Sequence, residues 1–182
     1  MKIHGEGIAT MSESGQMLDV YFPNIEFGEQ KTDYKALQIT SGTQEIIKLE
    51  WKKNDLDKPI NKISDAYFKL HLISNKFVLP NTINLDGLFD CLPNVAWTNK
   101  GPISIDEIEG KLNESKCGNN DLFIRSLDKF PCLTDYIIPK KVRIADASRV
   151  RLGAYLSEGT TIMHEGFVNF NAGTLGKAMI EG

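Results

Sequence analysis

Aliphatic side chains recur every six residues in the last part of the chain, a period that fits neither an α-helix nor an alternating strand. The series is Ile138, Ile144, Val150, Leu156, Ile162, Val168, Thr174 and Ile180, with Thr174 as its one polar member. Four places after each of the first seven stands a compact residue: Val142, Ser148, Ala154, Thr160, Gly166, Ala172 and Ala178. This double register predicts a parallel β-helix of hexapeptide repeats, with the aliphatic residue in a narrow core and the compact residue at a corner. The alternative is an irregular β segment with accidental spacing.

The preceding part of the chain mixes strand and helix patterns. Residues 1–28 predict a β-hairpin around a turn at 12–16, and residues 46–51 predict a further strand. Helix signals begin at Ser64-Asp65, for a helix that reaches Phe77, and at Ser104, for a helix over 105–112. Further expected elements are a short helix within 85–92 and an extended piece at 94–99. We therefore predict an α+β N-terminal domain over residues 1–130 and a β-helical segment over residues 131–182.

Composition narrows the class of protein. The 182 residues are 41% hydrophobic and 25% charged, which is typical of a globular protein, and the net charge of −3 gives no general reason to bind nucleic acid. No apolar run has the length of a membrane span, and no signal peptide is recognisable. The three cysteines are widely spaced and form no CxxC pair, so they predict neither disulfides nor a thiolate metal site. These features favour a cytoplasmic protein with no membrane or nucleic-acid partner.

The hexapeptide series is short for a solenoid. Three six-residue faces make one coil, so residues 138–182 supply about two and a half coils, whereas about three or more repeats are needed for stability. An open end would expose core residues and unpaired strand edges. The pattern therefore predicts either that the sequence is truncated or that another chain covers this end.

Two strings in this region carry a family resemblance. The segment that begins with LDKFPCLTDYIIP, and above all the string MHEGFVNFNAGTLG at 163–176, closely resembles the tetrahydrodipicolinate N-succinyltransferase family. The first 125 or so residues match that family only in general character. The resemblance implies a left-handed β-helix, a homotrimer, and active sites in the clefts between neighbouring helices. It also implies a small-molecule reaction of lysine and diaminopimelate biosynthesis, the transfer of succinyl from succinyl-CoA to the amino group of acyclic L-2-amino-6-oxopimelate.

The same resemblance assigns roles to two glutamates. Glu181, in the string MIEG, stands at the position of the family's catalytic glutamate. A carboxylate there can act as the general base that deprotonates the substrate ammonium, or as a nucleophile that forms an acyl-anhydride. Burial in a cleft between subunits would raise its pKa from about 4.3 toward a useful value. Glu165 matches the glutamate of a magnesium site on the trimer axis, although Ser148 replaces the aspartate of that site.

Other residues leave alternatives open. His164 would be the base in a different hexapeptide acyltransferase that acts on a sugar or another amine. Arg149 and Arg151 would either bind substrate carboxylates or be structural. Asn169 and Asn171 would either stack as a polar ladder or line the cleft. A third possibility is a noncatalytic module whose short β-helix serves only for trimerisation.

Overall fold

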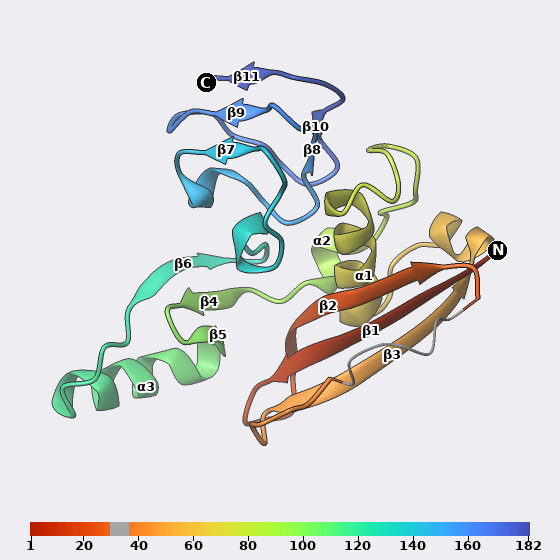
Figure 1. The fold of residues 1–182 in the computed structure, drawn as a ribbon. Coiled ribbons are helices and arrows are strands. Elements are labelled where there is room, and N and C mark those ends of the chain that lie inside the picture. Colours follow the sequence, from red (N-terminus) through yellow and green to blue (C-terminus); the bar gives the residue numbers. More distant parts are fainter. Residues whose placement is uncertain (30–36) are drawn as a thin grey trace.

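The computed structural model describes residues 1–29 and 37–182 of the chain. Its first part is an antiparallel sheet in the order β2-β1-β3, formed by β1 (Lys2–Met11), β2 (Met17–Phe27) and β3 (Gln44–Lys52). The helix α1 (Ile63–Ser74) packs on this sheet (Figure 1). Glycine at position 5 permits this close approach, because a Cβ there would lie 2.4 Å from the ring of Phe68. The predicted hairpin and third strand are confirmed.

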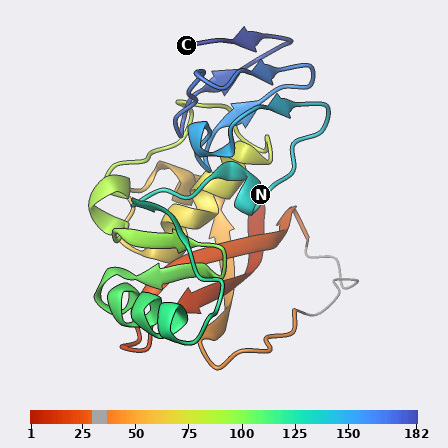
Figure 2. The ribbon, with the colours of Figure 1, turned by 90° about the vertical axis from the view of Figure 1, so that its left-hand side faces the viewer.

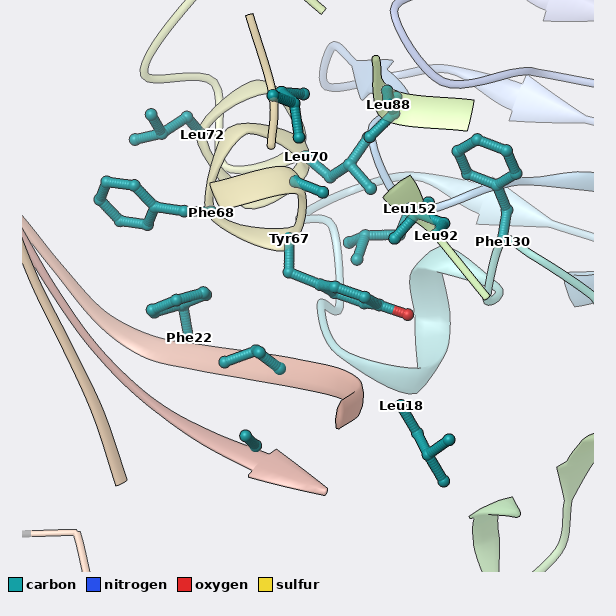
Figure 3. Packing of buried hydrophobic residues seen from close by; sticks show 14 of the residues in the cluster. Leu18, Phe22, Tyr67, Phe68, Leu70, Leu72, Leu88, Leu92, Phe130 and Leu152 are labelled. Atoms are coloured by element: carbon teal, nitrogen blue, oxygen red, sulfur yellow. The ribbon is translucent and has the colours of Figure 1, made fainter. Parts of the chain in front are cut away.

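The helix α1 is the centre of the main core. Its side chains from Ala66 to Phe68 and from Leu70 to Ile73 are essentially inaccessible to solvent, and Figure 3 shows how Tyr67, Phe68 and Leu70 contact the surrounding elements. The sequence placed the end of this helix too late, because Phe77 lies beyond it and is 45% exposed. The Lys69 ammonium is also buried, and it donates hydrogen bonds to the carbonyl oxygens of Leu56, Lys58 and Asn84 at 2.6–3.0 Å. These bonds compensate for the loss of hydration of the charge.

His71 is a buried, neutral core histidine. Its Nδ1 lies 2.7 Å from the carbonyl oxygen of Tyr67, and its Nε2 accepts the amide hydrogen of Phe22 at 3.3 Å. Burial lowers the pKa of His71 to about 4. Both ring nitrogens of His71 are therefore occupied by backbone groups.

We expect His71 to make folding stability depend on pH. Its pKa in the folded state lies below the ordinary value of 6.5, so the unfolded state binds more protons between pH 6.5 and pH 4 and the folded state loses stability as the pH falls. The free energy of unfolding should fall by about 2 kcal/mol between pH 7 and pH 5 from this residue. Urea unfolding at the two pH values, in the wild type and in His71→Gln, measures this effect.

A suitable control for that experiment is His164→Gln, because the His164 side chain is 72% exposed. Burial raises the pKa of the Asp19 carboxyl, so protonation of this group stabilises the folded state. Asp19 therefore changes the free energy of unfolding with pH in the direction opposite to His71. Comparison of variants therefore isolates the contribution of His71. An equal pH dependence in the wild type and His71→Gln would contradict the assignment.

A second antiparallel sheet, in the order β5-β4-β6, follows in the chain. It contains β4 (Val95–Thr98), β5 (Gly101–Ser104) and β6 (Ile124–Asp128), and α3 (Ile105–Cys117) packs against β4 and β5. The short helices η1 (Lys53–Asp57), α2 (Leu88–Cys91) and η2 (Leu133–Asp135) lie in the connections. Ser104 is the N-cap of α3 as expected, but its side chain makes no capping hydrogen bond. The α+β character predicted for this part of the chain is confirmed.

Stacked parallel coils form the rest of the structure (Figure 1). One face consists of β7 (Arg143–Ile144), β9 (Thr161–Ile162) and β11 (Met179–Ile180), and another of β8 (Tyr155–Leu156) and β10 (Gly173–Thr174). The third carries η3 (Ala147–Arg149) and a parallel bridge. Partners in all three faces are 18 residues apart: Ile144, Ile162 and Ile180; Leu156 and Thr174; Val150 and Val168.

The core of these coils agrees with the hexapeptide series, with one correction. Val150, Leu156, Ile162 and Val168 are at most 3% exposed. Ile138, the first member of the predicted series, is 90% exposed, because the coils begin only at β7.

The polar member of the series has its own buried partner. The Thr174 hydroxyl is 2.6 Å from that of Thr160 and accepts the amide hydrogen of Ser157 at 3.1 Å. This pairing satisfies the polar atom that interrupts the aliphatic core.

The coils and the preceding part of the chain share buried contacts. Phe170 stacks on Phe130 with ring centroids 4.6 Å apart, and Leu152 belongs to the main core (Figure 3). The amide of Gly153 donates to Ser74 Oγ of α1 at 2.8 Å. Figure 2 shows the coils stacked beyond the end of the two sheets. Within the described ranges, no helix combines the length and apolar character needed to cross a bilayer.

Candidate active site on the stacked coils

Glu181 follows directly after β11 and is exposed to solvent. Its position along the coil is fixed by the strand before it, since Ile180 pairs with Ile162 and the Ile180 carbonyl accepts the amide hydrogen of Met163 at 2.9 Å. Gly166 leaves room for this carbonyl, because a Cβ there would lie 2.5 Å from the Ile180 oxygen. The coil below therefore holds the backbone that carries the Glu181 carboxylate.

Glu165 lies on the same edge of the coils. The backbone of Gly182 passes beside it, so that a Cβ on Gly182 would be 3.1 Å from the Glu165 Cβ. The Glu165 carboxylate accepts a hydrogen bond from Arg149 at 3.0 Å, and its other oxygen is 3.9 Å from His164 Nε2. The fold thus brings the backbones of the two predicted site positions, 165 and 181, together at one edge.

An aspartate, Asp146, is present one coil before Glu165, two residues before Ser148, which occupies the position of the family's aspartate. Asp146 Oδ1 accepts hydrogen bonds from the amide and the hydroxyl of Ser148, at 2.9 and 2.7 Å. The pKa of Asp146 is lowered chiefly by these two hydrogen bonds, with smaller contributions from Arg149 and His164. Ser148 therefore orients a carboxylate on the neighbouring corner.

Arg151 is a structural residue of the junction. Its guanidinium pairs with Asp128 at 3.0 Å and donates to Asn169 Oδ1 at 3.1 Å. It also lies over the rings of Phe130 and Phe167, 4.9 and 5.6 Å from their centroids. These contacts favour the structural interpretation of Arg151 over substrate binding.

The two asparagines of the FVNFNAG string bind different partners. Asn169 contacts Arg151, as described above. Asn171 Oδ1 accepts the amide hydrogen of Asn81 at 2.7 Å, and its Nδ2 donates to Asn81 Oδ1 at 2.9 Å. Asn171 therefore anchors the loop after α1 to the coils.

A single chain does not provide a metal site at Glu165. Among the described residues, no group of three or more histidine, cysteine, aspartate or glutamate side chains is arranged to hold a metal ion. Glu165 is already paired with Arg149, and the Ser148 hydroxyl donates to Asp146. The residues of one chain thus do not fit a bound magnesium ion, and a site there would need carboxylates from several chains.

Comparison with known proteins shows which enzymes the chain resembles. A model described as "Tetrahydrodipicolinate N-succinyltransferase middle" matches residues 92–131. The chain is 42% identical to 2,3,4,5-tetrahydropyridine-2,6-dicarboxylate N-succinyltransferase from Salinispora tropica over an alignment 195 residues long. The alignment includes 98% of this chain and 60% of that protein. The chain is thus similar to tetrahydrodipicolinate N-succinyltransferases over almost its whole length.

Two further proteins show the same similarity. The protein of the same name from Pseudomonas aeruginosa is 54% identical over 126 residues, which are 69% of this chain and 37% of that protein. The crystal structure of a protein from Campylobacter jejuni, assigned as a 2,3,4,5-tetrahydropyridine-2-carboxylate N-succinyltransferase, superposes with a TM-score of 0.81 at 26% identity. That match covers 99% of this chain and 61% of the other. The chain spans about 60% or less of the length of these relatives.

Proposed function

We propose that this protein transfers the succinyl group of succinyl-CoA to the amino group of tetrahydrodipicolinate, in its acyclic form L-2-amino-6-oxopimelate, in lysine and diaminopimelate biosynthesis. The observation that carries the proposal is the match of almost the whole chain, at 42% identity, to a protein named for this activity. The coil geometry adds support, because it presents Glu181 on a backbone held in register by the coil below.

In the proposed reaction Glu181 acts as the general base. The substrate amine must lose a proton before its nitrogen can attack the thioester carbonyl of succinyl-CoA, and a positioned carboxylate can accept that proton. Collapse of the tetrahedral intermediate breaks the carbon–sulfur bond, releases the CoA thiolate and leaves an amide. Attack by Glu181 itself, with an acyl-anhydride intermediate, would place the same residue in a different role.

Several features of the assembly are proposals on the same basis. The family resemblance supports a left-handed winding of the coils, a homotrimer with clefts between neighbouring subunits, and a division into residues 1–130 and 131–182. Glu165 would supply one carboxylate per chain to a magnesium ion on the trimer axis. We also propose a cytoplasmic location, with the three cysteines as free thiols.

An assay of CoA release from the purified product of the complete gene tests the function. We expect thiol release from succinyl-CoA that requires tetrahydrodipicolinate, with much slower release when acetyl-CoA replaces succinyl-CoA or glucosamine replaces the acceptor. Activity on glucosamine that exceeds activity on tetrahydrodipicolinate would favour a sugar acyltransferase instead. Absence of thiol release with every acceptor would favour a noncatalytic module.

A further inference from the structure

The edge of the coils that carries Glu165 holds side chains of both charge signs. Asp146 precedes η3 and Arg149 ends it, and His164 and Glu165 follow β9 on the next coil. Two carboxylates thus share this edge with one permanent cation, the Arg149 guanidinium, and with an imidazole. Glu165 is also the residue at which the family resemblance places magnesium, so the contacts of its carboxylate decide how readily a metal ion binds.

Arg149 is the direct partner of the Glu165 carboxylate. Arg149 Nη2 donates to Glu165 Oε2 at 3.0 Å, and among the described residues its side chain forms no other hydrogen bond. The second oxygen, Glu165 Oε1, lies 3.9 Å from His164 Nε2. Both oxygens of this carboxylate therefore already face groups that carry or can accept a positive charge.

Ser148 reduces the negative charge that a metal ion would find at this edge. Its amide and its hydroxyl both donate to Asp146 Oδ1, at 2.9 and 2.7 Å, so the serine supports a neighbouring carboxylate and supplies none of its own. Carboxylates are the ligands that contribute charge to a magnesium site. Each chain therefore offers one carboxylate at these two family positions, Glu165, while the Arg149 cation beside it is retained.

We propose that Arg149 is a built-in cation that competes with magnesium for Glu165 and so keeps the metal affinity of this edge low. The inference rests on the magnesium site proposed above. A metal ion that binds Glu165 Oε2 must displace the Arg149 guanidinium from it, and the two cations then repel each other at short range. The Arg149–Glu165 pair thus balances the charge of this edge when no metal ion is bound.

Binding of Mn²⁺ to the complete gene product tests this competition. Mn²⁺ prefers the same oxygen ligands as Mg²⁺, and the electron paramagnetic resonance signal of the free ion measures how much is bound. We expect Arg149→Gln to bind Mn²⁺ at least about tenfold more tightly than the wild type, because the competing charge is gone. Arg149→Lys keeps that charge, and its dissociation constant should stay within about threefold of the wild-type value.

Two further variants locate the effect at Glu165. Lys141→Gln is the matched control, because Lys141 forms a comparable ion pair between coils, with Glu158 at 2.8 Å, and its side chain is 77% exposed. Its loss removes the same charge at another corner and should leave Mn²⁺ affinity unchanged. Addition of Glu165→Gln to Arg149→Gln should abolish the tighter binding. An equal gain in Lys141→Gln, or tight binding that survives the loss of Glu165, would refute the assignment.

The binding measurement needs no turnover, so it separates this inference from the proposed reaction. CoA release is measured on the same preparations. A protein that shows the expected order of Mn²⁺ affinities but releases no CoA would count against succinyl transfer and support the role of Arg149. Active protein in which the wild type and Arg149→Gln bind Mn²⁺ equally, or in which neither binds it, would overturn the role of Arg149 alone.

Discussion

Glu181→Gln is expected to lower kcat of the complete gene product by about 10²- to 10⁴-fold, the usual contribution of a positioned general base. Glutamine has nearly the shape of glutamate but cannot accept the ammonium proton or attack a thioester. The Glu181 side chain is exposed on this chain, so the substitution should not disturb the fold. Steady-state rates of CoA release, together with circular dichroism of both proteins, measure the two effects separately.

His164→Ala provides the matched comparison, because His164 lies on the coil directly below and is the rival base. Its imidazole is exposed and lies 3.9 Å from Glu165, so its loss should change kcat less than about threefold if Glu181 is the base. A large loss in His164→Ala with full activity in Glu181→Gln would reverse the assignment of the base.

Gly173→Ala is expected to destabilise the coils severely. Gly173 pairs with Tyr155 of the coil below, and a Cβ at this position would lie 1.8 Å from the Tyr155 carbonyl oxygen. Its φ of +155° is also one that residues with side chains rarely adopt. Separation of the two backbones would break the β8–β10 pairing, so the free energy of unfolding should fall by about 4 kcal/mol or more. Urea unfolding followed by circular dichroism measures this change.

Gly176→Ala is the control for that experiment, three residues further along the same coil. A Cβ at position 176 would meet no atom within 4 Å, so this variant should unfold within about 0.5 kcal/mol of the wild type. If Gly173→Ala proved as stable as Gly176→Ala, the close stacking of adjacent coils described above would be wrong.

The sequence predicted the coils well because their geometry repeats. Every coil must place an aliphatic side chain in the same narrow core, and the resulting six-residue period is visible without any knowledge of long-range contacts. It failed at Ile138, where the period continues by chance but the chain has not yet entered a coil and the side chain is 90% exposed. The six-residue period alone cannot show whether a residue such as Ile138 is buried, because its burial requires a neighbouring coil.

The first part of the chain was predicted less completely. The hairpin and helices follow from local patterns, but the burial of His71 and of the Lys69 ammonium depends on contacts between distant segments. The same limit applies to the buried Asp19 carboxyl, whose partner Tyr136 lies 117 residues away. The family model matches residues 92–131, mostly outside the strings that suggested the family from the sequence. An α+β segment has no repeating pattern of core positions, so its individual residues are harder to recognise by eye.

The most direct test of the proposed transfer is the fate of the succinyl carbonyl. The complete gene product would be incubated with succinyl-CoA carrying ¹³C at the thioester carbonyl and with ¹⁵N-labelled tetrahydrodipicolinate, and the product examined by NMR. We predict a one-bond coupling between ¹³C and ¹⁵N in the wild-type product, and its near absence with Glu181→Gln over the same time. Release of CoA with the label in free succinate, and no ¹³C–¹⁵N bond, would contradict succinyl transfer to the amine.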